Sequence, residues 1–433
     1  MKSEKKSFLV AFSTILVLMI FTYVLTLTLD CKGISLIKFV LSPILTLGAS
    51  GGITIISICI FLLIIGGVSY NLNECGFMKY MLDKIVHKYG TQRYKLLWII
   101  PLFFMCLGSL IGSFEEVVPI TPIVVSLIVG LGFDVYTGLA ISLLATGFGF
   151  AAGVFNPFNI GVAQSLVNIP MFSGVSLRLL TFVLIYLSLE LLVITHARKI
   201  ARDIDSEVNK DFEVDINKQK AFKAFVIILS IGLVLVLSSS FITVLRDYTI
   251  IIIGLFFLIA GVTSTILSKT SAKKFFSNFL KGALDIAPSI ILILMASSIK
   301  YIMEESGVIN TVVDILINLT SSMSKVSLIL FIYLICLILE VFIPSGSAKA
   351  FLLIPLVAPV ALKYGISLQL VVLAYAFGDG FSNVYYPTNP ALIICLGLVK
   401  LDYKDWFKHS IKYQLTNLII TCGILLLGLA INY

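Results

Sequence analysis

The sequence predicts an all-α polytopic membrane protein. Hydrophobic residues make up 59% of the 433 residues and charged residues only 12%, whereas soluble domains contain about 45–50% and about 25% respectively. Several uncharged runs have the length of about 20 residues that a helix needs to cross roughly 30 Å of hydrocarbon. These two observations exclude a soluble globule and a disordered chain. The 31 basic residues form no polar basic tract, which excludes a nucleic-acid-binding protein.

Eight apolar runs are long enough to be spans, and a weaker one lies at 286–303. The eight runs are 8–28, 51–70, 135–168, 175–195, 224–245, 248–268, 364–399 and 413–433. The first run resembles a signal peptide, but it lacks a small-x-small cleavage site, so we expect a retained helix. Together with the interrupted segments, these runs predict about 9 to 11 spans.

Two segments, 96–131 and 326–363, each contain two apolar arms separated by a polar stretch of Gly, Ser or charged residues. We interpret both as re-entrant hairpins. Non-helical backbone at membrane depth is tolerated only where protein or a water-filled cavity satisfies its polar groups. Each interruption therefore indicates a site.

The runs 135–168 and 364–399 are interrupted by Asn and Pro, so we expect broken helices, in which each Pro leaves carbonyl groups without helical partners. A shift of 233 residues superposes the first hairpin and broken helix on the second. The matched pairs are Pro122/Pro355, Val124/Val357, Gly132/Gly365, Gly147/Gly380, Phe148/Phe381, Asn156/Asn389 and Pro157/Pro390. Because most of these residues break helices, the match predicts an internal repeat.

The basic residues predict the orientation. With the N-terminus in the cytoplasm, 23 of the 31 Lys and Arg residues lie on the cytoplasmic side, as the positive-inside rule requires. They occupy the N-terminal tail and the loops 71–96, 196–223, 269–283 and 400–412. This placement holds only if both hairpins return to the side from which they entered.

The same threading makes the two halves enter from opposite sides of the membrane. We therefore expect a first inverted repeat at 1–200, a cytoplasmic linker with an extra span at 201–245, and a second inverted repeat at 246–433. The protein is predicted to lie in the inner (cytoplasmic) membrane with its C-terminus outside. Paired broken segments in two inverted halves are typical of the midplane binding site of a transporter.

Four segments resemble the signature segments of YfcC-type carriers, which belong with the four-carbon dicarboxylate anaerobic carriers of the ion transporter superfamily. They are GSFEEVVPITP at 112–122, GFGFAAGVFNPFNIGVAQ at 147–164, IPSGSAKA at 343–350 and FGDGFSNVYYPTNP at 377–390. The resemblance covers essentially the whole chain. It implies secondary transport by an elevator-type carrier, in which hairpin-bearing units move against a scaffold. Members are described as dicarboxylate carriers or as basic amino-acid antiporters.

The first hairpin tip carries two adjacent acids, Glu115 and Glu116, close to Ser113. Each ionised acid at bilayer depth costs about 2.5–3.5 kcal/mol. We therefore expect at least one of them to face a cavity and to bind a substrate ammonium group, Na⁺ or H⁺. The alternative is that the acids only cap the second arm, because a helix N-terminus attracts negative charge.

The second tip carries Ser345, Ser347 and Lys349, and Lys349 superposes on Glu116 under the shift of 233 residues. Hydroxyl groups, backbone amides and an ammonium group suit a substrate carboxylate, assisted by the dipole of the following helix. The alternative is that Lys349 neutralises Glu115 or Glu116 permanently and touches no ligand.

Asn156, Asn159, Asn383 and Asn389 flank the breaks and are expected to bind polar groups of the substrate. Asp379 is the one acid of the run 364–399. It either pairs with the lysine of the second tip or serves as a Na⁺ ligand or proton carrier. The three acids and one lysine of the predicted site give a net charge of −2, which favours a positively charged substrate or coupling ion.

Other ionisable residues are assigned structural roles. Glu190 and Glu340 lie inside predicted spans but away from the breaks, so we expect helix–helix hydrogen bonds or a protonated acid. His87, His196 and His409 are predicted at the cytoplasmic face, too far apart for a metal site.

These features predict a secondary active transporter, either an antiporter or an ion-coupled carrier, and not an enzyme. The chain has no P-loop, no HExxH and no His inside a predicted span. The charge of the site favours a basic or zwitterionic amino acid such as arginine or ornithine. The alternative is a Na⁺- or H⁺-coupled four-carbon dicarboxylate carrier. We expect lipid contacts, no nucleic-acid partner and no cofactor beyond a coupling ion, and a homodimer is left open.

Overall fold

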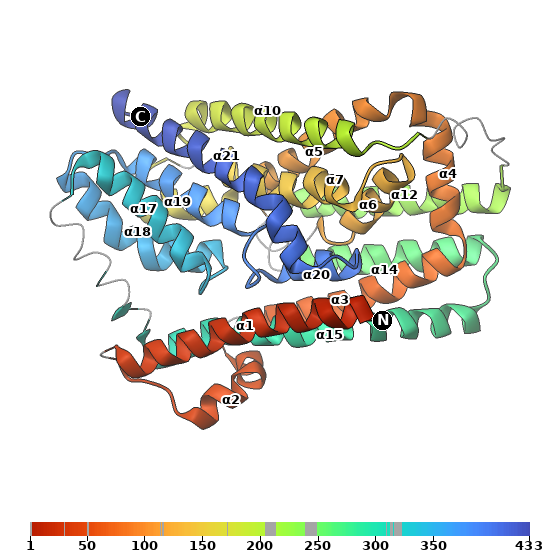
Figure 1. The fold of residues 1–433 in the computed structure, drawn as a ribbon, viewed down its shortest axis with the longest axis horizontal. Helices are drawn as coiled ribbons and strands as arrows, with labels where there is room; N and C mark the ends of the chain where they lie inside the picture. Colours follow the sequence, from red (N-terminus) through yellow and green to blue (C-terminus); the bar gives the residue numbers. More distant parts are fainter. Residues whose placement is uncertain are drawn as a thin grey trace.

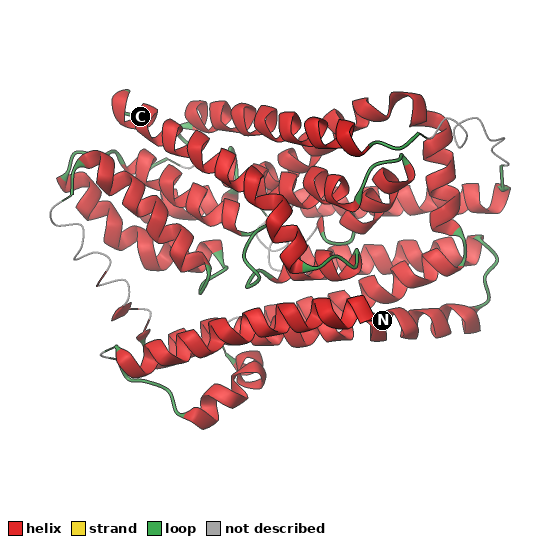
Figure 2. Cartoon of the chain, in the orientation of Figure 1, coloured by secondary structure: helices red, strands yellow, loops and turns green. Residues whose placement is uncertain are grey.

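The computed structural model describes residues 2–29, 31–49, 52–112, 114, 117–170, 172–203, 214–238, 249–308, 310–311, 315 and 323–433. All regular secondary structure in these ranges is helical (Figure 2). The prediction of an all-α chain is therefore confirmed for the described part.

The helices follow the expected apolar runs in order. Their bounds are α1 (Lys2–Thr28), α2 (Leu36–Leu45), α3 (Gly52–Glu74), α4 (Phe77–Tyr89), α5 (Arg93–Ile111), α6 (Thr121–Gly130), α7 (Val135–Leu139), α8 (Ala145–Ala152), α9 (Val162–Leu166), α10 (Val175–Ile200), α12 (Ile216–Ser238), α14 (Thr249–Leu267), α15 (Ala272–Ser306), α17 (Lys325–Glu340), α18 (Gly346–Lys363), α19 (Leu368–Ser382), α20 (Pro390–Leu398) and α21 (Tyr403–Ala430). Short 3₁₀ turns η1 (Thr46–Gly48) and η2 (Gly90–Gln92) follow α2 and α4, and π-helical segments η4 (Ala140–Leu144) and η5 (Pro157–Gly161) interrupt the first broken helix.

The helices form two bundles that pack side by side (Figure 1). The long-helix bundle contains α1, α3, α12, α14 and α15. The hairpin bundle contains α5 to α10 and α17 to α21. Helices α8 and α19 lie at the centre of the hairpin bundle, because every residue of α8 and every residue of α19 from Leu370 to Ser382 is buried.

Six helical segments of the described chain are long and apolar enough to cross a membrane. They are Ile55–Glu74, His87–Leu110, Val135–Ala152, Val175–Ile200, Ala272–Ser306 and Tyr403–Ala430. The prediction of about 9 to 11 spans also counted shorter pieces, such as Gly254–Leu267 and Leu368–Ser382. The break in the run 364–399 divides it into the two shorter helices α19 and α20.

The sequence prediction is wrong for 269–303, where it placed a cytoplasmic loop and a separate span. The structure has one helix of 35 residues, α15, which begins after the N-cap Ser271 and continues through Pro288. A proline is tolerated in a membrane helix when neighbouring groups satisfy the freed carbonyl. Close packing holds α15 against α3, since a Cβ atom at Gly282 would lie 2.3 Å from the carbonyl oxygen of Gly66.

Both predicted broken helices are interrupted at their Asn-Pro pairs. In the first, α8 ends at Ala152 and η5 begins at Pro157; in the second, α19 ends at Ser382 and α20 begins at Pro390. Gly153 has φ +53° at the end of α8, a left-handed conformation that glycine adopts at little cost.

The two broken helices cross each other where the shift of 233 residues aligns them. The rings of Phe148 and Phe381 meet edge to face at 5.5 Å. A Cβ atom at Gly380 would lie 2.2 Å from Cα of Ala151. Close approach of two backbones in a membrane requires small residues at the crossing, so glycine is needed here.

We predict that Gly380→Ala lowers the stability of the protein by about 1–3 kcal/mol, because the added methyl group overpacks this crossing. The measurement is the melting temperature of the purified protein in detergent. Gly423→Ala is the matched control, since no atom lies within 4 Å of a Cβ at this helical glycine of α21. That control should be neutral or stabilising. Equal melting temperatures for the two variants would contradict the packing argument.

Candidate functional site

A lysine and two acids meet inside the hairpin bundle. Lys349, in the first turn of α18, pairs with Glu340 at the end of α17 and with Asp379 in α19. Its Nζ atom lies 2.8 Å from Oδ1 of Asp379. All three residues are 0% exposed. We call these three residues the Lys349 cluster.

Burial makes this cluster costly unless its charges are paired. Removing an ion from water costs several kcal/mol in proteins, and only close partners offset this penalty. Two carboxylates and one ammonium group leave a net charge of −1 when all three are ionised. The cluster therefore attracts one further positive charge.

The first broken helix reaches the same cluster through Asn159. Its Nδ2 atom donates a hydrogen bond of 2.8 Å to Oδ2 of Asp379. The backbone N–H of Asn159 in turn donates to Oδ1 of Asn156 at 3.1 Å. Both asparagines are fully buried. The break in the first half thus supplies an amide donor to an acid of the second half.

The N-terminus of α18 packs directly against Asp379. A Cβ atom at Gly346 would lie 2.7 Å from Oδ2 of this acid, so only glycine permits the contact. The hydroxyl of Tyr375 donates to the carbonyl oxygen of Gly346. The partial positive charge of a helix N-terminus favours a carboxylate, and Asp379 occupies that position here.

At the second break, Asn389 is the N-cap of α20. Its Oδ1 accepts from the N–H groups of Ala391 at 2.9 Å and Leu392 at 3.4 Å, and its Nδ2 donates to Asn383 at 2.6 Å. Asn383 donates to the carbonyl oxygen of Asp379 at 3.0 Å. Both amides therefore satisfy helix ends in this conformation, and their contact with substrate stays a prediction.

Helix α21 supplies donors to the carbonyl groups at the same break, a contribution that the sequence analysis missed. Trp406 Nε1 donates to Val384 at 2.9 Å, Tyr403 to Tyr385 at 3.0 Å, and Gln414 to Phe381 at 3.0 Å. No local sequence motif predicts these bonds, because they join residues 18 to 33 positions apart.

The other predicted site residues belong to the two hairpin tips. Ser345 is the N-cap residue of α18 but makes no side-chain cap bond. Ser113, Glu115 and Glu116 lie outside the described residues, and so does the side chain of Ser347. Of the two alternatives for Asp379, the structure has the pairing with Lys349, which leaves a role in ion binding as a prediction.

The placement of Glu340 away from the breaks was wrong. This acid is the last residue of α17 and lies at the hairpin tip, in contact with Lys349. The turn between the two arms brings the end of one arm beside the start of the next. An acid just before the Pro344-Ser345-Gly346 turn, opposite a lysine just after it, was the available signal.

The statement that the histidines lie far apart was also wrong for two of them. The rings of His196 and His409 have centroids 4.7 Å apart, and His196 Nε2 lies 2.8 Å from Oδ2 of Asp134. Asp134 also accepts from the N–H and hydroxyl of Thr137 at 2.8 and 2.6 Å. Among the described residues, no group of three or more His, Cys, Asp or Glu side chains could hold a metal ion.

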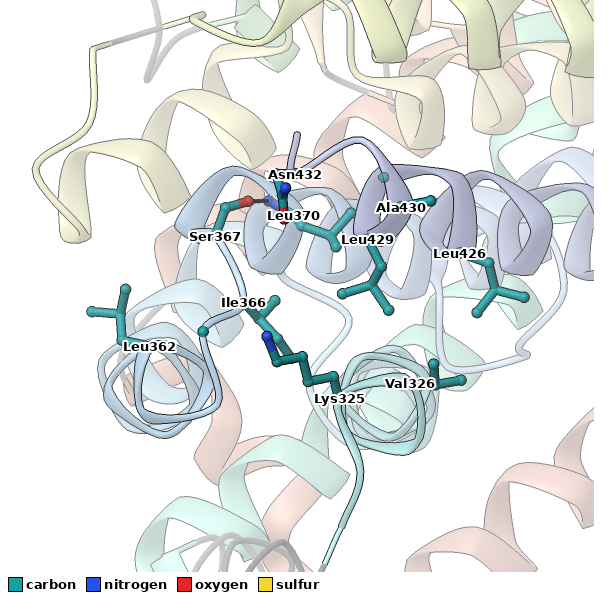
Figure 3. Close-up of a pocket in the computed structure, with 12 residues that line it drawn as sticks. Lys325, Val326, Leu362, Ile366, Ser367, Leu370, Leu426, Leu429, Ala430 and Asn432 are labelled. Carbon is teal, nitrogen blue, oxygen red and sulfur yellow. Dashed lines mark hydrogen bonds between the residues drawn. The ribbon is translucent and has the colours of Figure 1, made fainter.

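A cavity of about 680 Å³ lies between α17, α18, α19 and α21 (Figure 3). It is lined by Lys325, Val326, Leu362, Gly365, Ile366, Ser367, Leu370, Leu426, Gly428, Leu429, Ala430 and Asn432. Leu362 is 13 residues beyond Lys349 on α18, or roughly 20 Å along a helix. Its lining contains one ionisable side chain, so this cavity offers little polar chemistry for a substrate.

We predict that Asp134 stabilises the fold in a pH-dependent way. Burial raises its pKa, but the hydrogen bonds from Thr137 and the contact with His196 outweigh this and lower the pKa below its ordinary value near 3.8. The stabilisation is therefore complete above the unfolded-state pKa and is lost as the pH falls through the lower folded-state pKa. Melting temperature against pH should fall less steeply below pH 4 in Asp134→Asn than in wild type. Asp83→Asn, an exposed residue of α4, should follow wild type.

We predict that Lys349→Met destabilises the protein by about 3–5 kcal/mol, because it leaves two buried acids without their cation. The double variant Lys349→Met with Glu340→Gln should melt at a higher temperature than the single variant. Lys325→Met, at an exposed lysine of α17, is the control for removing a positive charge. A Lys349→Met protein as stable as the Lys325→Met protein would contradict the pairing.

Comparisons with known proteins agree with a membrane carrier. The profile of the family described as "DcuC: C4-dicarboxylate anaerobic carrier" matches residues 12–430. The chain is 29% identical over 396 residues to the Escherichia coli protein described as "Putative basic amino acid antiporter YfcC", covering 84% of this chain and 75% of that protein. It is 24% identical over 374 residues to an uncharacterized protein of Haemophilus influenzae, covering 83% and 72%.

Two solved transporter structures resemble the chain at low identity. The Alcanivorax borkumensis YdaH transporter matches with a TM-score of 0.47 at 15% identity, over 99% of both chains. Neisseria gonorrhoeae MtrF matches with a TM-score of 0.41 at 14% identity, over 97% and 94%. Because the family profile covers nearly the whole length, the chain belongs to the C4-dicarboxylate anaerobic carrier family of integral membrane transporters.

Proposed function

We propose that this carrier is a secondary active transporter that moves a basic or zwitterionic amino acid, such as arginine or ornithine, across the cytoplasmic membrane. The observation that carries the proposal is the Lys349 cluster. It is a fully buried group of charges, net negative, where the second hairpin meets both broken helices. The name printed for the Escherichia coli relative supports the same substrate class.

The ammonium and carboxylate groups of an amino acid bind different partners in this arrangement. The substrate ammonium group binds acids: Asp379 in the second half, and Glu115 or Glu116 in the first tip. The substrate carboxylate shares the N-terminus of α18 with Asp379, where backbone N–H groups and the Ser345 hydroxyl act as donors. H⁺ or Na⁺ is the coupling ion at the same acids.

We propose that the hairpin bundle is the moving unit of an elevator and that the long-helix bundle is its scaffold. The division into an inverted repeat at 1–200, a linker with an extra span at 201–245 and a second repeat at 246–433 fits this scheme. The crossing of α8 and α19 supports it, because aligned residues of the two halves meet there. The distribution of basic residues supports a cytoplasmic N-terminus and an external C-terminus.

The family description favours a second candidate, a carrier of four-carbon dicarboxylates. Lys349 and the N-terminus of α18 are then the groups that bind carboxylate. This candidate requires that protons or Na⁺ neutralise the neighbouring acids, because a dianion is repelled by a site with negative charge. The two candidates therefore differ in the sign of the substrate charge that the cluster accepts.

We predict that purified protein is stabilised by arginine or ornithine and not by succinate or fumarate. A ligand that binds only the folded state adds about 2.7 kcal/mol of stability at a hundredfold excess over its dissociation constant. The measurement is a thermal-shift screen, followed by uptake of the stabilising compound into proteoliposomes. Stabilisation by dicarboxylates alone would favour the second candidate instead.

The same uptake assay tests the first hairpin tip. Glu115→Gln and Glu116→Gln should reduce amino-acid uptake if an ammonium group binds there, whereas Glu304→Gln, an acid partly exposed on α15, should not. Wild-type rates in both tip variants would rule out this ammonium site.

A further inference from the structure

We propose that Glu340 is the proton-binding residue of this carrier, and that a proton and a cationic substrate compete for the one unbalanced negative charge of the Lys349 cluster. The proton site follows from geometry alone. The competition rests on the proposed function, and the experiments below separate the two.

The first step is the charge of the cluster. Glu340, Lys349 and Asp379 are all fully buried, and the two carboxylates exceed the ammonium group by one negative charge. An unbalanced charge in a low-dielectric interior is costly, and a buried acid avoids the cost by binding a proton. One proton makes the cluster neutral.

The second step is the choice between the two acids. Asp379 has three stabilising neighbours: Lys349 at 2.8 Å, the amide of Asn159 at 2.8 Å, and the N-terminal turn of α18 at Gly346. Glu340 contacts Lys349 through Oε2, but its buried Oε1 has no hydrogen-bond partner. Hydrogen bonds and positive charge favour the ionised form of an acid. The proton therefore binds to Glu340.

The titratable groups around this acid do not change the assignment. Cys336 lies one turn earlier on α17 and is buried, and Tyr375 of α19 already donates its hydroxyl proton to Gly346. Asn159 is the neighbour from the first half and is neutral. Among the described residues that face the cluster, Lys349 and Asp379 are the charged ones.

The exchange step balances in charge and atoms. When a cationic group of the substrate enters, the O–H bond of the Glu340 carboxylic acid breaks and the proton passes to water that enters with the substrate. The cluster then holds a carboxylate and the substrate cation in place of a neutral acid. In the reverse step the carboxylate takes a proton from water as the substrate leaves. Lys349 remains charged throughout. One cation, either the proton or the substrate, is therefore enough to neutralise the cluster.

The proton site can be tested without transport, by infrared difference spectra of purified protein between high and low pH. We expect a C=O stretching band of a protonated carboxylic acid that shifts to lower frequency when glutamate is labelled with ¹³C at its side-chain carboxyl. The band should disappear in Glu340→Gln and persist in Glu115→Gln and Glu116→Gln. A band that is unaffected by the glutamate label, or a spectrum of Glu340→Gln that equals that of the wild type, would overturn the proposal.

Glu190→Gln is the matched control, since Glu190 of α10 is also fully buried and neither of its carboxyl oxygens has a partner. The band of Glu340 should persist in this variant. If Glu340→Gln does not fold, Asp379→Asn gives a second test. Without the charge of Asp379 the cluster is neutral when Glu340 is ionised, so the labelled band should move to lower pH. A midpoint unchanged in Asp379→Asn would contradict the shared charge.

Competition is measured by adding arginine to wild-type protein in weakly buffered solution. Below the midpoint of the band, we expect release of about one proton for each arginine bound and an apparent affinity that rises by up to about tenfold per pH unit. Glu340→Gln should bind arginine without releasing a proton. Binding without proton release in wild type would overturn the competition. If no amino acid binds while the Glu340 band is present, the proposed substrate fails and the proton site stands.

Discussion

The architecture of the hairpin bundle depends on one requirement, that the ammonium group of Lys349 must be paired where water is absent. Glu340 comes from one arm of the hairpin and Asp379 from the broken helix. A single buried cation therefore joins three helices, α17, α18 and α19. Because breaking a buried ion pair is far more costly than losing a surface pair, this contact determines where the hairpin tip sits.

Irregular backbone can exist beside this cluster because its polar groups have partners. Asn389 caps α20, and three side chains of α21 bind carbonyl groups at the second break. The glycine at 380 lets α8 and α19 approach closely enough for Asn159 to reach the acid of the other half. The site is thus assembled from both halves, and neither half contains it alone.

A cluster with one surplus negative charge links the chemistry of the site to transport. In a dry interior, such a site is stable only when a proton or another cation completes it. The proposed exchange of one cation for another then follows from charge balance, without a separate regulatory element. The same argument explains why a lysine is useful beside two acids: it reduces the deficit to a single charge.

The sequence predicted well whatever depends on local properties. Hydropathy identified the membrane class, and Asn-Pro pairs marked the breaks at 156–157 and 389–390, because helix-breaking is a property of the residue itself. The sequence marks Lys349 and Asp379 because a charge inside an apolar run is visible without a structure, and the structure pairs the two residues. The two alternatives for Asp379 stayed open, since a partner far away in the chain has no local signature.

Only the tertiary structure decided which side chains meet. Glu340 was assigned to a helix interior, and it lies at the hairpin tip because α17 ends there. The rings of His196 and His409 come from helices that are distant in the chain and pack side by side. Helix α15 continues through Pro288 and packs closely against α3. Helix rotation and packing set these contacts, and both depend on all the neighbouring helices at once. Hydropathy and helix breaks, in contrast, are properties of single residues.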